Sequence, residues 1–134
     1  MKKNVLLLIA SLFFTFIPLT SHAEFTVSMY RDLKVLTTSP DVETAKRTKE
    51  MISTYLMGVA SGANEISQFE KAKNGTEMPY CIPKGTLLTP RMAEDIVDRV
   101  LADRSVKLDN VDSMGISRIY VIGVLRYYKC PTLL

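Results

Sequence analysis

Three acidic side chains stand close together in the second half of the chain. Glu94, Asp95 and Asp98 fall within two turns of a predicted helix. Paired carboxylates can carry out acid–base chemistry when one of them is desolvated and so stays protonated near neutral pH. Arg91 and Arg99 lie beside them, however, and acidic residues are favoured near the positive end of a helix dipole. We therefore interpret these carboxylates as a solvated helix face, with a catalytic pair as the alternative.

Histidine chemistry is nearly absent from the sequence. The one histidine is His22, which lies in a segment that we expect to be removed. Hydrolases of the Ser-His-Asp or Cys-His type need an imidazole base, and a catalytic zinc site usually needs at least one histidine ligand. We therefore predict that the protein is not an enzyme, with no catalytic residues, no metal and no cofactor.

The two cysteines, Cys81 and Cys130, form an even pair. In an oxidising compartment such a pair indicates a disulfide, which here would enclose 48 residues. Closing a loop of that length is worth about 4 kcal/mol. A reactive thiol is the alternative, but neither cysteine has a neighbouring base in the sequence that would activate a thiolate. We favour the structural bridge.

A compact polar cluster follows the predicted third helix. Asp109, Asn110 and Asp112 belong to a turn-like stretch that runs from Arg104 to Asp112. These residues could form a turn and a helix cap, or a protruding loop that contacts a partner. Sequence physics alone does not choose between these two interpretations.

The first residues have the layout of a secretory signal peptide. Lys2 and Lys3 precede a 13-residue apolar run from Val5 to Ile17, and small residues stand before a cut after Ala23. A membrane anchor is the alternative, but a spanning helix needs about 20 apolar residues. We predict cleavage after Ala23, a periplasmic product and no stable membrane insertion afterwards.

Length and charge exclude other classes of protein. The chain has 134 residues, of which 47% are hydrophobic and 23% charged, and its net charge is +3. This composition is that of one ordinary folded domain. Removal of 23 residues, two of them lysines, leaves 111 residues (134 − 23) with a net charge of +1 (15 − 14). Such a charge excludes a strongly basic surface, so we expect no nucleic-acid partner.

The apolar spacing predicts a small all-α bundle of about four helices over residues 24–134. The first helix covers 25–36, and the second is capped by Ser39 and runs to about Lys73. The third starts at Thr89 and ends near Asp103, and the fourth extends from Ser113 to Cys130. Nothing in 24–134 alternates clearly as a strand does, and the disulfide would join the fourth helix to the loop before the third.

The second helix carries two glycines four residues apart, Gly58 and Gly62. Such a strip allows another helix to approach closely. We expect packing within the chain, with Gly123 of the last helix as a candidate contact. A helix-mediated homodimer is the alternative.

Several of these segments resemble the Rap/Tai family of immunity proteins from type VI secretion. The resemblance covers most of 24–134 and rests on the Tyr-Leu-Met-Gly stretch at 55–58, the Cys-Ile-Pro-Lys-Gly turn at 81–85 and the Lys-Cys-Pro end at 129–131. The chain differs from the family outline at 103–105, where Asp-Arg-Ser replaces a proline-containing segment, and at Cys130, which precedes its proline.

The resemblance implies a small all-α periplasmic protein that binds and blocks a peptidoglycan amidase effector. In some family members a loop between the last two major helices enters the amidase cleft, and several members act as dimers, so a homodimer is a further expectation. On this chain the loop corresponds to Arg104–Asp112. The contacts it implies are Asp109, Asn110, Asp112, Lys107 and Arg104.

Two other functions fit the same composition. A periplasmic stress chaperone is also small, helical and bridged by one disulfide, but residues 24–134 contain no histidine that would titrate near pH 6. A small carboxylate enzyme acting on the cell wall would need a raised pKa on one acid of the cluster at 94–98.

Overall fold

The computed structural model of the protein describes residues 24–83 and 85–131. Four α-helices and one short 3₁₀-helix cover most of this range. They are α2 (Val27–Leu36), α3 (Val42–Asn74), α4 (Pro90–Ala102), η2 (Val111–Ser113) and α5 (Ile116–Tyr127). No strand occurs within the described ranges, where an antiparallel bridge joins Thr26 to Gly115. The all-α prediction is therefore confirmed, whereas the predicted signal peptide at 1–23 lies outside the described residues.

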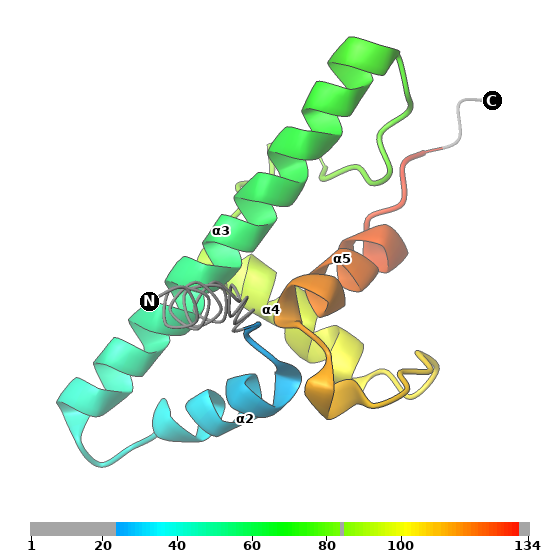
Figure 1. Cartoon of the computed structure of the whole chain (residues 1–134). Helices are drawn as coiled ribbons and strands as arrows, with labels where there is room; N and C mark the ends of the chain where they lie inside the picture. Colours follow the sequence, from blue (N-terminus) through cyan, green and yellow to red (C-terminus); the bar gives the residue numbers. More distant parts are fainter. Residues whose placement is uncertain (1–23, 84, 132–134) are drawn as a thin grey trace, which may run out of the picture.

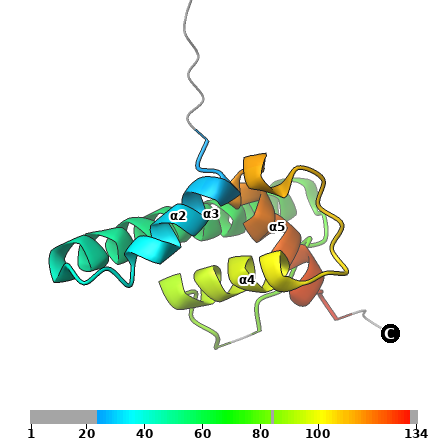
Figure 2. The same ribbon diagram turned by 90° about the horizontal axis from the view of Figure 1, so that it is seen from below.

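The long helix α3 is the backbone of the arrangement. It contains 33 residues and so extends about 50 Å. Figure 1 shows α2 beside the first half of α3 and the green loop after α3 turning back along the second half. Seen from below, α4 and α5 lie together on one side of the long helix (Figure 2). The three shorter helices therefore bury one face of α3 and leave another uncovered.

Local capping explains where α3 begins and ends. The cap is Asp41, whose carboxylate accepts a hydrogen bond from the Thr44 N–H at 3.2 Å. The predicted cap, Ser39, is wrong because its hydroxyl instead accepts from the Asp41 N–H, which places both Ser39 and Pro40 before the helix. Gly75 ends the helix in the left-handed region at φ 64°, as its type and position predict.

The other helix boundaries follow the same logic with one correction. Thr89 caps α4 as predicted, and its hydroxyl accepts from the Met92 N–H at 3.1 Å. The fourth helix is shorter than predicted at both ends. Backbone bonds pull 114–116 into an extended pairing with 25–27, and the Cys81 N–H donates to the Tyr128 carbonyl at 2.7 Å after the helix has ended.

The hydrophobic core lies where all four α-helices meet. Its largest fully buried side chains come from each helix in turn: Val27, Tyr30, Ile52, Leu56, Val97, Val100, Ile116, Ile119, Tyr120 and Val124. Complete burial of side chains of this size contributes about 1.5–3 kcal/mol each. The core therefore provides the main force that holds α2, α4 and α5 against α3.

The predicted disulfide is confirmed. Cys81 and Cys130 are joined, with their Cα atoms 4.7 Å apart. The bond ties the loop between α3 and α4 to the segment that follows α5. As predicted, it connects the middle of the chain to its end.

The glycines do not pack as expected. Gly123 of α5 lies against α4, where an added Cβ would stand 2.3 Å from Ile96 Cγ2 and 3.0 Å from Val100 Cγ2. An added Cβ at Gly58 or Gly62 would meet nothing within 4 Å. The expectation that these two glycines pack inside the chain is therefore wrong, because α5 approaches α4 rather than this face of α3.

Replacing Gly123 by alanine is expected to destabilise the fold. The new Cβ would collide with the Ile96 side chain and would also stand 3.3 Å from the Ile96 carbonyl oxygen. Because the backbone carbonyl cannot rotate away as a side chain can, α4 and α5 must separate. Overpacking of this kind costs about 1–3 kcal/mol, which urea unfolding would measure. Gly62→Ala is the matched control. It has open space and should gain about 0.5–1 kcal/mol from helix propensity, so an equal loss in both variants would contradict the packing described.

Candidate functional site

The segment between α4 and η2 carries the chain from α4 toward α5. It runs from Asp103 to Asn110, and Figure 2 shows it leaving the end of α4 and returning over the start of α5. It contains most of the positions that the sequence singled out as contacts. We call residues 103–113 the α4–α5 loop, and its backbone is held at both ends.

The first end is braced by Asp103. Its Oδ1 accepts hydrogen bonds from the Ser105 N–H at 2.9 Å and from the Ser105 hydroxyl at 2.6 Å. Arg126 of α5 donates to Ser105 Oγ at 2.6 Å and places Nε 3.2 Å from Asp103 Oδ2. The Ser105 hydrogen bonds, with a smaller contribution from Arg126, hold the pKa of the Asp103 carboxyl below its usual value. The turn after α4 is therefore fixed to the side of α5.

The second end is braced by residues of α2. Arg31 forms an ion pair with Asp112, although both side chains remain at least half exposed. Near this ion pair, the Val27 N–H donates to the Met114 carbonyl at 2.9 Å. The Ile116 N–H donates to the Phe25 carbonyl, also at 2.9 Å. These bonds fix the chain where it enters α5. The loop is therefore anchored to two different helices.

Between these anchors the loop alternates between the core and the solvent. Its apolar side chains pack against the core and are partly buried: Val106, Leu108 and Val111. Arg104, Lys107, Asp109 and Asn110 are exposed. Asn110 adopts the left-handed conformation at φ 51°, which asparagine tolerates better than most residues. The apolar contacts press the loop onto the bundle and leave a polar tip facing outward.

The structure divides the five predicted contact residues into two groups. Arg104, Lys107, Asp109 and Asn110 are exposed without a side-chain partner among the described residues, whereas Asp112 is paired with Arg31. Asp112 therefore positions the loop as well as being exposed. The sequence did not predict the bracing residues Arg31 and Arg126. Their partners, Asp112 and Ser105, lie 81 and 21 residues away, and no local pattern indicates pairs so far apart.

The acidic residues of α4 do not form the predicted solvated face. Lys34 of α2 places Nζ 2.5 Å from Glu94 Oε1 and 2.9 Å from Asp98 Oδ2. The buried Tyr30 donates its hydroxyl hydrogen to Asp98 Oδ1 at 2.7 Å. Asp95, by contrast, is exposed on another side of the helix. Two of the three carboxylates therefore join α4 to α2, and the expected neighbours Arg91 and Arg99 are not their partners.

This polar junction shifts the pKa values of the groups that donate to it. Burial raises the pKa of the Tyr30 phenol, and the hydrogen bond to Asp98 raises it further. Partial burial lowers the pKa of Lys34, but its hydrogen bonds to Glu94 and Asp98 outweigh this effect and the net change is upward. Tyr30 therefore stays protonated and Lys34 stays charged, as an anchoring contact requires.

The described residues form neither a metal site nor a membrane-spanning helix. Among the residues described, no group of three or more histidine, cysteine, aspartate or glutamate side chains is arranged to hold a metal ion. None of the helices within 24–131 is both long and apolar enough to cross a membrane.

Comparison with known proteins finds no relative of this chain. Neither protein-family models, nor curated proteins, nor solved structures match the chain.

The junction between α2 and α4 predicts different effects for two neighbouring acids. Asp98→Asn removes the charge that Lys34 faces and weakens the acceptor for Tyr30, so we expect a loss of about 1–2 kcal/mol of stability. Asp95→Asn is the matched control and should change stability by less than about 0.5 kcal/mol. Chemical unfolding would compare them, and equal effects would contradict the junction.

The brace at Asp103 predicts a pH effect with a definite sign. The folded pKa of Asp103 lies below its ordinary value of 3.8, so its contacts stabilise the fold above that value and are lost as the pH falls through the folded pKa. Ser105→Ala removes the hydroxyl donor and should move the Asp103 pKa upward in an NMR titration. Ser113→Ala, whose hydroxyl donates to the Asn110 carbonyl instead, should leave it unchanged. No movement with Ser105→Ala would show that the brace is not formed.

Proposed function

We propose that the protein is a periplasmic immunity protein that binds a peptidoglycan amidase effector of type VI secretion and occludes its active site with the α4–α5 loop. The observation that carries this proposal is a polar loop tip on a backbone that is braced at both ends. The resemblance of the chain to the Rap/Tai family supplies the class of partner. The protein itself has no catalytic role in this proposal.

A braced loop suits an inhibitor for a physical reason. Binding a flexible segment costs the conformational entropy of ordering it, so a loop that is already fixed binds more tightly for the same contacts. The braces at Asp103 and Asp112 lie at the ends of the loop, away from its tip. The tip therefore remains available, with Asp109 and Asn110 exposed between the two anchored ends.

The tip also carries the polar groups that recognition needs. Asp109 offers a carboxylate, Asn110 offers both a donor and an acceptor, and Lys107 adds a nearby cation. Charged groups at such a contact speed the encounter and select the partner more than they raise affinity. An amidase cleft with basic and amide groups around its catalytic centre is the kind of surface that this tip complements.

The disulfide and the first 23 residues support the proposed compartment. Disulfides form and persist in oxidising environments such as the periplasm. The bond between Cys81 and Cys130 fits that setting, and the charged start and apolar run of residues 1–23 fit an export signal. We therefore place the working protein at residues 24–134.

The test combines capture with inhibition. The exported, oxidised protein, with its N-terminal residue checked to be Glu24, is immobilised and exposed to extracts of the bacterium that encodes it. Mass spectrometry then identifies what binds, and the purified partner is assayed for cleavage of peptidoglycan peptide cross-links. We expect one dominant partner that is an amidase and that the protein inhibits at a one-to-one ratio of binding sites.

Variants locate the surface. Asp109→Ala combined with Asn110→Gly should weaken inhibition at least about 30-fold without lowering thermal stability, because glycine keeps the left-handed backbone of position 110 and the two lost side chains contact the partner rather than the fold. Thr76→Ala combined with Glu77→Ala removes similar groups from the exposed loop after α3 and is the matched control. If both double variants inhibit equally well, the α4–α5 loop is not the contact. Binding to many unrelated unfolded proteins would favour a chaperone instead.

A further inference from the structure

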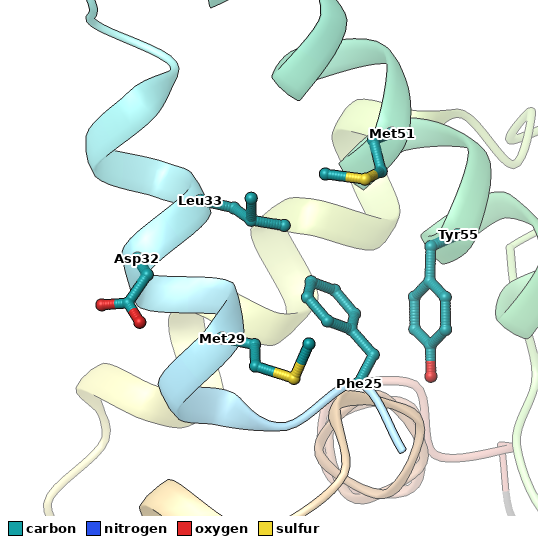
Figure 3. A pocket seen from close by; sticks show the side chains of 6 residues that line it. All are labelled: Phe25, Met29, Asp32, Leu33, Met51 and Tyr55. Carbon is teal, nitrogen blue, oxygen red and sulfur yellow. The ribbon is translucent and has the colours of Figure 1, made fainter. Parts of the chain in front are cut away.

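An apolar groove lies between α2 and α3, on the side of α2 that does not face α4. It encloses about 370 Å³ and is lined by Phe25, Met29, Asp32, Leu33, Met51 and Tyr55. Figure 3 shows the two methionines, the leucine and the two aromatic rings turned toward the space between the helices. Sites for small molecules usually enclose more than about 300 Å³ and have mostly hydrophobic and aromatic walls. The groove has the size and the lining of such a site.

The walls of the groove combine rigid and adaptable side chains. Phe25 and Tyr55 meet edge to face with their ring centroids 4.7 Å apart. Met29 is 50% exposed and Met51 is 52% exposed, and the unbranched methionine side chain adjusts readily to what it contacts. The groove can therefore enclose an apolar chain without requiring one exact shape.

A single charged side chain stands at the rim of the groove. Asp32 of α2 is exposed and points outward, without an ion-pair partner within 24–83 and 85–131. The cations beside it on α2, Arg31 and Lys34, are already paired with acids of the α4–α5 loop and of α4. The carboxylate at the rim is therefore left to interact with a ligand.

The charge at the rim selects the kind of ligand. A fatty acid whose chain entered the groove would bring its carboxylate close to Asp32, and like charges repel. An ammonium group at the end of the same chain would instead pair with Asp32. Ammonium groups are also attracted to the faces of aromatic rings, which Phe25 and Tyr55 provide in the groove. The lining thus favours a chain with a cationic end over a chain with an anionic one.

We propose that the groove between α2 and α3 binds a cationic amphiphile, a single apolar chain that ends in an ammonium group. The chain lies among the methionines and the aromatic rings, and the ammonium group pairs with Asp32 at the rim. Because one wall belongs to α2 and the other to α3, a bound ligand joins these helices and stabilises the folded state as its concentration rises.

Isothermal titration calorimetry of the exported, oxidised protein tests this proposal. The probes are decylammonium and decanoate, which have the same number of carbon atoms and opposite charges, each used below the concentration at which it forms micelles. We expect decylammonium to bind at one site per chain and about 5-fold or more tighter than decanoate, because Asp32 attracts one head group and repels the other. The methyl signals of Met29 and Met51 should shift together in an NMR titration.

Two variants separate the contribution of the head group from that of the chain. Asp32→Asn should remove the preference for decylammonium, and Asp95→Asn, which removes the same charge from an exposed position of α4, is its matched control. Met51→Ser should weaken the binding of both probes about 4-fold or more, because it removes apolar contact that both chains share. Leu87→Ser, at a position 81% exposed in the loop before α4, should leave both affinities unchanged.

Three results would overturn the proposal. The first is that neither probe binds, and the second is that decylammonium binds no more tightly than decanoate. The third is a protein with twice the mass of one chain that becomes a monomer in Met51→Ser, because a second copy would then cover the groove. None of these measurements involves an amidase, so their outcome is separate from that of the inhibition test.

Discussion

The close approach of α5 to α4 at Gly123 is the contact on which the rest of the fold depends. Only a residue without a side chain allows Ile96 and Val100 to lie directly on the α5 backbone. This approach sets the distance between the end of α4 and the start of α5, and so the span that residues 103–115 must bridge. On α4 itself, Glu94 and Asp98 pair with Lys34 of α2. The helix α4 is therefore held by an apolar contact with α5 and by a polar junction with α2.

The bundle is held by two kinds of force that act in different places. Apolar burial holds the centre, where side chains of all four helices are fully enclosed. Polar pairs and the Cys81–Cys130 bond hold the periphery, where α2 meets α4 and where the chain leaves α5. Apolar burial brings the helices together but does not fix how they are oriented. Polar pairs depend on geometry, so they fix the relative orientation of the helices.

Most of the architecture could be predicted from the sequence because it is determined locally. Helix number, the cap at Thr89, the stop at Gly75 and the single disulfide each follow from residue type and spacing. The pairing of Lys34 with Glu94 and of Arg31 with Asp112 could not be predicted, since charges so far apart in sequence have no recognisable spacing. The start of α5 was misplaced for the same reason, because a distant segment, 25–27, competes for its backbone.

The candidate loop could be located in sequence, but its rigidity could not. A run of charged and turn-forming residues predicts exposure, and the exposed tip at Asp109 and Asn110 agrees with it. Whether such a run is mobile or fixed depends on side chains elsewhere, here Arg126 and Arg31. Likewise, two small residues on a helix indicate that a neighbour could approach, but not which face of the bundle would remain open.

The position of the disulfide has a consequence for proteolysis. Cys81 and Cys130 close a covalent ring that contains α4, the α4–α5 loop and α5. A protease that cuts once at the exposed Arg104 or Lys107 would open this ring without releasing a fragment. Both pieces would stay attached through the sulfur bridge, and the buried faces of α4 and α5 would keep them in register. Cleavage of this exposed loop would thus separate nothing.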